Sequence, residues 1–323
     1  MTGQAPSEPG IARELVDDLL ARAGLTGPWQ QEALGGVGYV NDHAGIALAD
    51  GTRLVVRRYR WPWPGDEPFD RGAKEAWLLP LLTGHAIPVP ELLATTYGAA
   101  LFTRVDGELL AEHADAEHAW RDLGASLRRV HSLDFGFDAA GLVVSGGMAP
   151  FEEGTWGAWH VANAFSHATR LAASRPDLRI DVTAIGDVME WARPLLDARP
   201  IRLLHNDPHP WNVLVHPVDG VWRLAAWLDW EFAWAADPQY DLMKNGLQRV
   251  SDIGPTPSSF YEGYGSGLEE PWFSLYALGF HLWMANDAIA GERTNLQSHR
   301  AAFAFVADLD AQLARLRDLL DEA

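Results

Sequence analysis

The sequence contains no cysteine, and only two of its 25 basic residues are lysines. The absence of cysteine excludes disulfide scaffolds, thiolate zinc sites, iron–sulfur clusters and thiol nucleophiles. Positive charge is scarce, because 25 Lys and Arg stand against 44 Asp and Glu and give the 323-residue chain a net charge of −19. Such a chain repels phosphates, which argues against a nucleic-acid or anionic-membrane partner.

Long hydrophobic runs are also lacking. The best candidate for a membrane span, Pro271–Asn286, has 16 uncharged residues and includes Ser274 and His281, so a buried core helix explains it better. The first ten residues lack a basic region followed by an apolar one, and no secretory signal is visible. We therefore expect a soluble, cytoplasmic protein.

The acidic residues are unevenly distributed along the chain. Residues 1–104 carry a net charge of −3, whereas residues 105–323 carry −16. Two interpretations remain open at this point. The surplus either keeps the protein in solution or draws cations to the C-terminal region.

The pattern of apolar residues changes part-way along the chain. The first third predicts a helix over 11–23, strands over 32–37, 44–48, 53–59, 91–94 and 100–105, and a helix over 69–82. The remainder predicts helices over 116–132, 159–173, 181–196, 238–250, 271–289 and 295–320, with strands over 201–204, 213–216 and 221–228. These elements predict an α+β protein with a small β-rich lobe, 1–104, and a larger helical lobe, 105–323. A ligand cleft is expected near their junction.

The segment LLHNDPHPWNVLVHP, residues 203–217, is the most informative part of the sequence. Asp207 and Asn212 stand between two apolar runs, and Asp229 ends a further run. Two carboxylates and an amide at the ends of buried strands have the chemistry that phosphoryl transfer needs. One carboxylate orients an attacking hydroxyl, while hard oxygen ligands hold magnesium against a triphosphate.

Two other interpretations of this segment stay open. Asp-Pro and Asn are common in turns, so the segment is also compatible with a tight loop between strands. A metal-dependent hydrolase is the second alternative, because His205, Asp207, His209 and His216 are four potential ligands.

The motifs resemble a known family. His205-x-Asp207-x4-Asn212, then Leu228-Asp229-Trp230-Glu231, then the segment from Asp237 to Leu242, are similar to those of the aminoglycoside phosphotransferase and choline kinase-like family. Its members are small-molecule kinases with a bilobal protein-kinase-like fold, and the resemblance covers roughly residues 30–290. It implies that Asp207 is the catalytic base and that Asn212 and Asp229 are magnesium ligands. His205 and Asp241 are implied to support the loop.

The N-terminal part of the resemblance concerns the nucleotide, ATP or GTP. Gly35, Gly36 and Gly38 match the phosphate loop, whose glycines let backbone N–H groups approach phosphates. The third strand has arginine where the family has lysine, and alternation along a strand lets only one of Arg57 and Arg58 face the site. We choose Arg57, with Glu75 on the next helix as its partner. The backbone around Thr103 and Val105 is implied to bind the purine.

The acceptor is the least specified part of the prediction. Acidic residues on the acceptor side predict a cationic, hydroxylated small molecule, and we name as candidate contacts Glu231, Glu269, Glu270 and Asp287. An aminoglycoside-type antibiotic is the first choice, which implies a role in antibiotic resistance. A macrolide, or choline or another metabolite, is the alternative acceptor. A non-catalytic nucleotide-binding module is the alternative of another class.

Overall fold

The structure is a computed structural model that describes residues 11–34, 41–60, 70–247, 255–290, 309, 311 and 313–319. Its contacts divide the chain into two compact units. Unit 1 consists of Met1–Ala116, Val144–Gly147 and Pro210–Glu231, and unit 2 of Glu117–Val143, Met148–His209 and Phe232–Ala323. The segment with Asn212 and Asp229, which the sequence places in the second lobe, is therefore part of unit 1.

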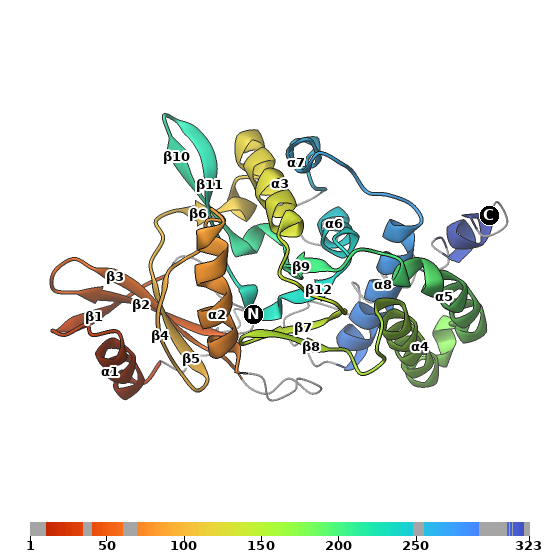
Figure 1. The fold of residues 1–323 in the computed structure, drawn as a ribbon, viewed down its shortest axis with the longest axis horizontal. Coiled ribbons are helices and arrows are strands. Elements are labelled where there is room, and N and C mark those ends of the chain that lie inside the picture. The colour runs from red at the N-terminus through yellow and green to blue at the C-terminus, as the bar shows by residue number, and fades with distance from the viewer. Residues whose placement is uncertain are drawn as a thin grey trace, which may run out of the picture. The chain divides into compact units, whose positions relative to one another are not determined.

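Unit 1 is built around an antiparallel sheet of five strands in the order β1-β2-β3-β5-β4. The strands are β1 (Trp29–Glu32), β2 (Asp42–Leu48), β3 (Arg53–Arg58), β4 (Leu92–Thr96) and β5 (Ala99–Thr103). Helix α1 (Arg13–Arg22) packs its buried residues Val16, Leu19 and Leu20 against this sheet, and α2 (Arg71–Gly84) contacts β4 (Figure 1). The Asp70 side chain caps α2 by accepting the N–H of Ala73.

A second sheet of unit 1 carries part of the motif segment. It has the order β11-β10-β6, with β6 (Glu108–Leu109), β10 (Val213–Val218) and β11 (Val221–Trp227). Three short 3₁₀ helices adjoin these strands in the chain, η1 (Leu110–Glu112), η3 (Pro210–Asn212) and η4 (Trp230–Phe232). The last residue of η4, Phe232, already belongs to unit 2. Because β10 and β11 are antiparallel neighbours, the segments just before β10 and just after β11 lie close together.

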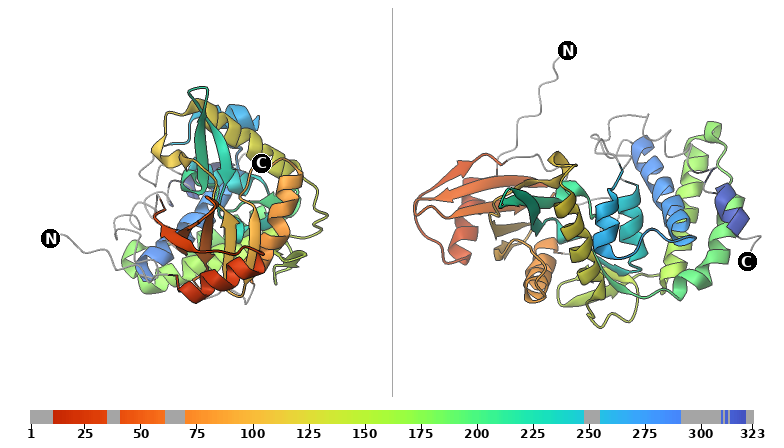
Figure 2. Two further views of the ribbon diagram at one scale, coloured as in Figure 1. Left: turned by 90° about the vertical axis from the view of Figure 1, so that its left-hand side faces the viewer. Right: turned by 90° about the horizontal axis from the view of Figure 1, so that it is seen from above.

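Unit 2 is mainly helical. Its long helices are α3 (Glu117–Ser132), α4 (Trp156–Ser174), α5 (Val182–Asp197) and α8 (Trp272–Ala290), and shorter ones are η2 (Pro176–Leu178), α6 (Gln239–Gly246) and α7 (Ser258–Tyr264). Helix α4 packs against both α5 and α8, and α3 packs along α7 (Figure 2). The main core contains aromatic and aliphatic residues from α4, α5, α6 and α8. A small sheet, β8-β7-β12-β9, adjoins these helices, with β7 (Gly141–Val144), β8 (Gly147–Pro150), β9 (Arg202–Leu204) and β12 (Trp234–Ala236).

Most predicted elements are present with shifted ends. Helix α4 begins at Trp156, earlier than predicted, because the Thr155 side chain accepts the N–H of Ala158 as an N-cap. The first strand was predicted too late, since β1 ends at Glu32. Five described strands and α-helices were missed, β6, β7, β8, β12 and α7, which are too short for a clear periodic pattern. Among the described residues, no helix is long and apolar enough to cross a bilayer.

Candidate active site

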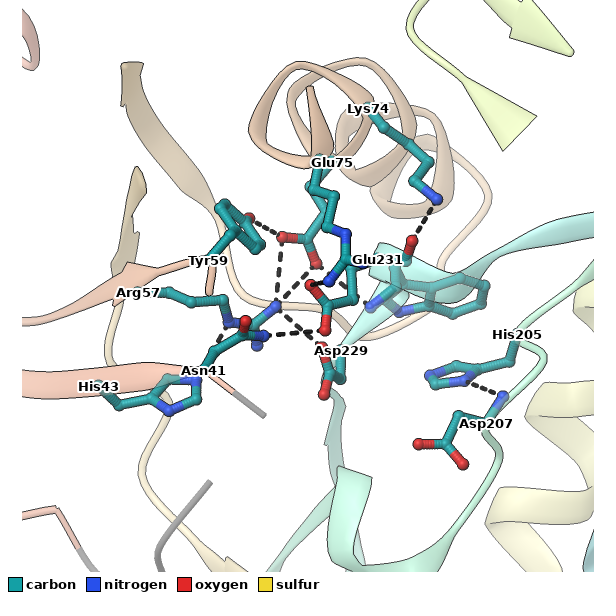
Figure 3. Close-up of polar contacts among 12 residues, drawn as sticks. Asn41, His43, Arg57, Tyr59, Lys74, Glu75, His205, Asp207, Asp229 and Glu231 are labelled. Atoms are coloured by element: carbon teal, nitrogen blue, oxygen red, sulfur yellow. Dashed lines mark hydrogen bonds and ion pairs between the residues drawn. The ribbon is translucent and has the colours of Figure 1, made fainter. Parts of the chain in front are cut away.

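Arg57 lies at the centre of the polar network of unit 1. Alternation along β3 turns it inward, where its Nη1 lies 3.1 Å from an oxygen of Glu75 and 3.1 Å from Oδ1 of Asp229 (Figure 3). Glu75 also accepts a hydrogen bond from the Tyr59 hydroxyl and from the N–H of Trp230 at 3.2 Å. One guanidinium thus joins the strand, helix α2 and the segment that carries Asp229.

The electrostatics of this network keep Arg57 charged. Burial by itself lowers the pKa of Arg57, but the carboxylates of Glu75 and Asp229 outweigh it and the pKa is raised. His43, the cross-strand partner on β2, accepts the Nε–H of Arg57 at its Nε2, 3.1 Å away. Burial and the positive charge of Arg57 lower the pKa of His43 to about 4. The imidazole is therefore neutral near pH 7, and its proton lies on Nδ1.

Arg58 faces the opposite side of the same strand. Its guanidinium binds the carboxylate of Asp42 and its side chain is 38% exposed, against 10% for Arg57. The choice of Arg57 over Arg58 therefore agrees with the direction in which each side chain points. The expected Arg57–Glu75 pair is present in the structure.

The two candidate magnesium ligands both belong to unit 1. The N–H of Leu228 donates to the carbonyl oxygen of Asn212 at 2.8 Å, so the residue before Asp229 is hydrogen-bonded to Asn212. Asp229 has a φ of 66°, a left-handed conformation that costs energy in a residue other than glycine and is often found at functional sites. Its side chain is 21% exposed, with one oxygen bound to Arg57. A carboxylate and an amide oxygen suit magnesium, which prefers a few hard oxygen ligands and retains phosphate or water as the others.

Glu231 is buried and holds this segment in place. Its two carboxylate oxygens accept hydrogen bonds from Asn41 at 2.8 Å and from Arg71 at 3.1 Å (Figure 3). Burial and the nearby charge of Asp229 raise the pKa of Glu231 to about 7. With 0% side-chain exposure, Glu231 does not face an acceptor. Its expected role as an acceptor contact is therefore wrong, because both oxygens are engaged inside unit 1.

The loop of the candidate base belongs to unit 2. The Asp207 N–H donates to Nδ1 of His205 at 3.2 Å (Figure 3), and His205 is fully buried. Asp241, in the first turn of α6, accepts the N–H groups of His205 and Asn206, each at 2.8 Å. These contacts agree with the bracing roles that the resemblance implies for His205 and Asp241.

A second layer of contacts holds Asp241. His131 Nε2 lies 3.1 Å from Oδ2 of Asp241 and Nδ1 lies 2.9 Å from the hydroxyl of Tyr264. Since the carboxylate only accepts, Nε2 of His131 carries a proton and donates a hydrogen bond to Asp241. Burial opposes ionisation of Asp241, but the hydrogen bond from His131 and the charges of His131, His205 and Lys244 lower its pKa. Helices α3, α6 and α7 therefore jointly fix the loop.

The remaining nucleotide residues are only partly described. Gly35, Gly36 and Gly38 lie outside the described residues. Thr103 ends β5, and its N–H already donates to the carbonyl oxygen of Glu91 at 2.9 Å. A hydrogen bond from this region to a purine N atom therefore has to come from a residue after Thr103, such as the half-buried Val105.

The other candidate acceptor contacts belong to the C-terminal part of unit 2. Glu269 is exposed, whereas Glu270 is half-buried and lies 2.9 Å from the guanidinium of Arg315. The backbone of Asp287 is part of α8, but its side chain lies outside the described atoms. Of the candidate acceptor contacts whose side chains are described, Glu269 is the most exposed.

Several residues that hold the site were not predicted from the sequence. His43 contacts Arg57, Tyr59 contacts Glu75, Asn41 and Arg71 hold Glu231, and Lys244 holds Asn206. Two of them left a usable signal, since the Asp50-Gly51 turn sets the register that pairs His43 with Arg57, and alternation puts Tyr59 on the same face as Arg57. The contacts of Asn41, Arg71 and Lys244 join segments far apart in the chain, so local patterns carry no trace of them.

Comparison with known proteins places this site in a family. The model of the phosphotransferase enzyme family matches residues 39–278. The chain belongs to this family. The expected small-molecule kinase with an α+β, protein-kinase-like fold is therefore confirmed. The comparison with curated proteins found no match.

Solved structures show the same fold at low sequence identity. Aminoglycoside phosphotransferase APH(4)-Ia is 18% identical, with a TM-score of 0.66 over 93% of this chain and 97% of the other. A gentamicin complex of APH(2'')-IIa is 14% identical, with a TM-score of 0.62 over 93% and 96% of the two chains. Ethanolamine kinase of Plasmodium vivax is also 14% identical, with a TM-score of 0.59 over 89% and 81%.

Proposed function

We propose that the protein transfers the γ-phosphate of ATP or GTP to a hydroxyl of a small cationic acceptor, an aminoglycoside-type antibiotic being the first choice. The observation that carries this proposal is the contact of Arg57 with both Glu75 and Asp229, together with the hydrogen bond from the N–H of Leu228, the residue before Asp229, to the carbonyl oxygen of Asn212. An always-charged fork held by two carboxylates is suited to binding phosphate oxygens.

Each residue then has a defined task. Asp207 orients the acceptor hydroxyl and takes its proton, while Arg57 neutralises charge on the triphosphate. Asn212 and Asp229 would hold magnesium, which supplies further neutralisation of the developing phosphate charge. Asp241 keeps the backbone of residues 205 and 206 fixed, so that Asp207 keeps its orientation without rearranging during the reaction.

Two observations support a cationic acceptor. Residues 105–323 have a net charge of −16, which attracts amines to this part of the chain. Structures of similar fold are described with gentamicin, with streptomycin and with hygromycin B, and another is an ethanolamine kinase. The likeness to the ethanolamine kinase favours an amino alcohol as the second candidate acceptor. A macrolide is the third, and an antibiotic acceptor would make the protein a resistance enzyme.

A screen of nucleotide turnover tests the proposal. Purified protein is incubated with ATP or GTP, magnesium and a panel of aminoglycosides, macrolides, choline and ethanolamine, and phosphorylated product is detected by mass spectrometry. Asp207→Asn should lower kcat about 10²–10⁴-fold and leave nucleotide binding intact, because it removes only proton transfer. Asp229→Asn should weaken magnesium-dependent nucleotide binding. Asp219→Asn, a change at an exposed turn residue, is the matched control.

The outcomes separate the classes of function. Near-normal turnover by either site variant contradicts the proposed roles. Nucleotide binding without turnover of any acceptor favours a binding module. The metal-hydrolase alternative has little structural support, because the described residues contain no group of three or more His, Asp or Glu side chains arranged to hold a metal. Ester hydrolysis without nucleotide would nevertheless revive it.

A further inference from the structure

The two lysines of the chain both donate to backbone carbonyl groups in the motif segments. Lys74 Nζ donates to the carbonyl oxygen of Glu231 (Figure 3), two residues after Asp229. Lys244 Nζ donates to the carbonyl oxygen of Asn206, directly before Asp207, and to Oδ1 of the same residue at 2.8 Å. The chain uses arginine at its 23 other basic positions.

Asn206 has an unusual backbone that needs support. Its φ is 65°, a left-handed conformation that asparagine tolerates but that still costs energy, and the residue is only 5% exposed. Its N–H is bound by Asp241 and its carbonyl and amide oxygens by Lys244. Asp241 and Lys244 are three positions apart on α6 and therefore share a face of the helix.

The geometry of the contact favours lysine over arginine. An ammonium group on a flexible stem directs separate N–H bonds to two oxygens of one residue, whereas a planar guanidinium needs a wider, coplanar arrangement. The ammonium group of Lys244 lies over the rings of Tyr240 and Phe280, with Nζ 5.2 and 5.5 Å from their centroids. These rings limit the paths that a bulkier head group can take.

We propose that Lys244 is a positioning residue for the candidate base Asp207, a role that rests on the proposed function. By holding both oxygens of Asn206, it fixes the peptide that leads into Asp207 and thereby the direction of the Asp207 carboxylate. Arg57, Asn212 and Asp229, the candidate nucleotide and magnesium contacts, belong to unit 1, whereas Lys244, Asn206 and Asp207 belong to unit 2. Loss of Lys244 should therefore lower kcat and spare nucleotide binding.

Kinetics of three variants test this role. Lys244→Met should lower kcat by about tenfold to a hundredfold, the effect of a misplacement of roughly 1 Å, with nucleotide KM changed less than about twofold. Lys244→Arg, which keeps the charge, should not restore kcat. Arg193→Met is the control, because it removes a positive charge of unit 2 from a side chain that is 52% exposed. Full activity of Lys244→Met would overturn the proposal, and full activity of Lys244→Arg would refute the stated preference for lysine over arginine.

The absence of cysteine allows a chemical rescue at this position. Lys244→Cys introduces the single thiol of the chain, and alkylation with 2-bromoethylamine converts it to a side chain with an amine at nearly the length of lysine. If alkylation is carried out on unfolded protein before refolding, it does not depend on access to the side chain. Kcat should be low before the reaction and recover after it. Failure to recover in refolded, fully alkylated protein would refute the role.

Hydrogen exchange separates failure of this inference from failure of the proposed function. The N–H groups of His205 and Asn206, bound to Asp241, report on the loop without any acceptor. They should exchange at least about tenfold faster in Lys244→Met, while amides of β3 keep their rates. Unchanged exchange would overturn the positioning role of Lys244 even if phosphotransfer is shown. Faster exchange in a protein that phosphorylates nothing would support the contact of Lys244 with the loop and refute the proposed function.

Discussion

Neighbouring arginines on β3 provide a sharp test of the site. Arg57→Met removes the charge that faces Glu75, whose side chain is 2% exposed, and Arg58→Met removes the charge that faces Asp42 at a position that is 38% exposed. Methionine retains most of the aliphatic stem, so packing changes little in either variant. The two substitutions thus differ in the burial of the arginine that is removed and in the cations that remain, because Asp42, 9% exposed, still pairs with Arg60.

The expected magnitudes follow from burial. Removing one partner of a buried ion pair costs about 3–5 kcal/mol because the other charge stays buried and unpaired. Within the described part of the chain, Glu75 keeps the Tyr59 hydroxyl and the Trp230 N–H as donors in Arg57→Met. Removing Arg58 should cost about 0–1 kcal/mol, because its guanidinium is exposed to solvent and Asp42 keeps its pair with Arg60.

Urea unfolding, followed by the fluorescence of the 15 tryptophans, measures these costs as shifts of the midpoint at constant m-value. A double variant, Arg57→Met with Glu75→Gln, sharpens the test. Neutralising the stranded carboxylate should recover about 2 kcal/mol or more of the loss, since a neutral pair is cheaper to bury than a lone charge. Equal costs for the two arginines, or a double variant no more stable than Arg57→Met, would refute the reasoning.

Three further predictions concern helix packing, pH and salt. A Cβ at Gly124 of α3 would lie 2.0 Å from the carbonyl oxygen of Phe260, so Gly124→Ala should destabilise the protein by about 1–3 kcal/mol. Gly186→Ala, where the nearest atom is 3.5 Å away, should instead stabilise α5 by up to about 1 kcal/mol in the same urea assay, and similar effects would contradict this. Burial lowers the pKa of His160 from 6.5 to about 4, so the folded protein keeps this ring neutral where the unfolded chain binds a proton. The free energy of unfolding is therefore unaffected by His160 above pH 6.5 and falls as the pH drops from 6.5 towards 4. His160→Gln should therefore reduce the slope of unfolding free energy against pH between 6 and 5 by up to about 1.4 kcal/mol per unit, and an unchanged slope would show that His160 is not neutral by burial. Lastly, kcat/KM for a cationic acceptor should fall as salt rises to 1 M, where the Debye length is about 3 Å, and a flat profile or a preference for anionic acceptors would exclude electrostatic capture.

The sequence by itself determined the chemistry of the motifs and the main elements. Alternation along residues 53–58 and the Asp50-Gly51 turn are local features, and they were enough to predict the β2–β3 hairpin and that only one of Arg57 and Arg58 faces inward. The choice of Arg57 came from the resemblance to the family's third strand. Helix α2, with Glu75, was also predicted from its apolar period. Local patterns report on such features because they depend on residues a few positions apart.

Tertiary structure alone decided how the motif residues are held. It placed Asn212 and Asp229 in unit 1, buried Glu231 between Asn41 and Arg71, and brought Lys244 to Asn206. Each of these contacts depends on the burial of a polar group, which is stable only when distant segments supply its hydrogen-bond partners. The sequence offered Glu231 only as a candidate acceptor contact. Only the packing of α2 against its segment made it an internal ion-pair partner.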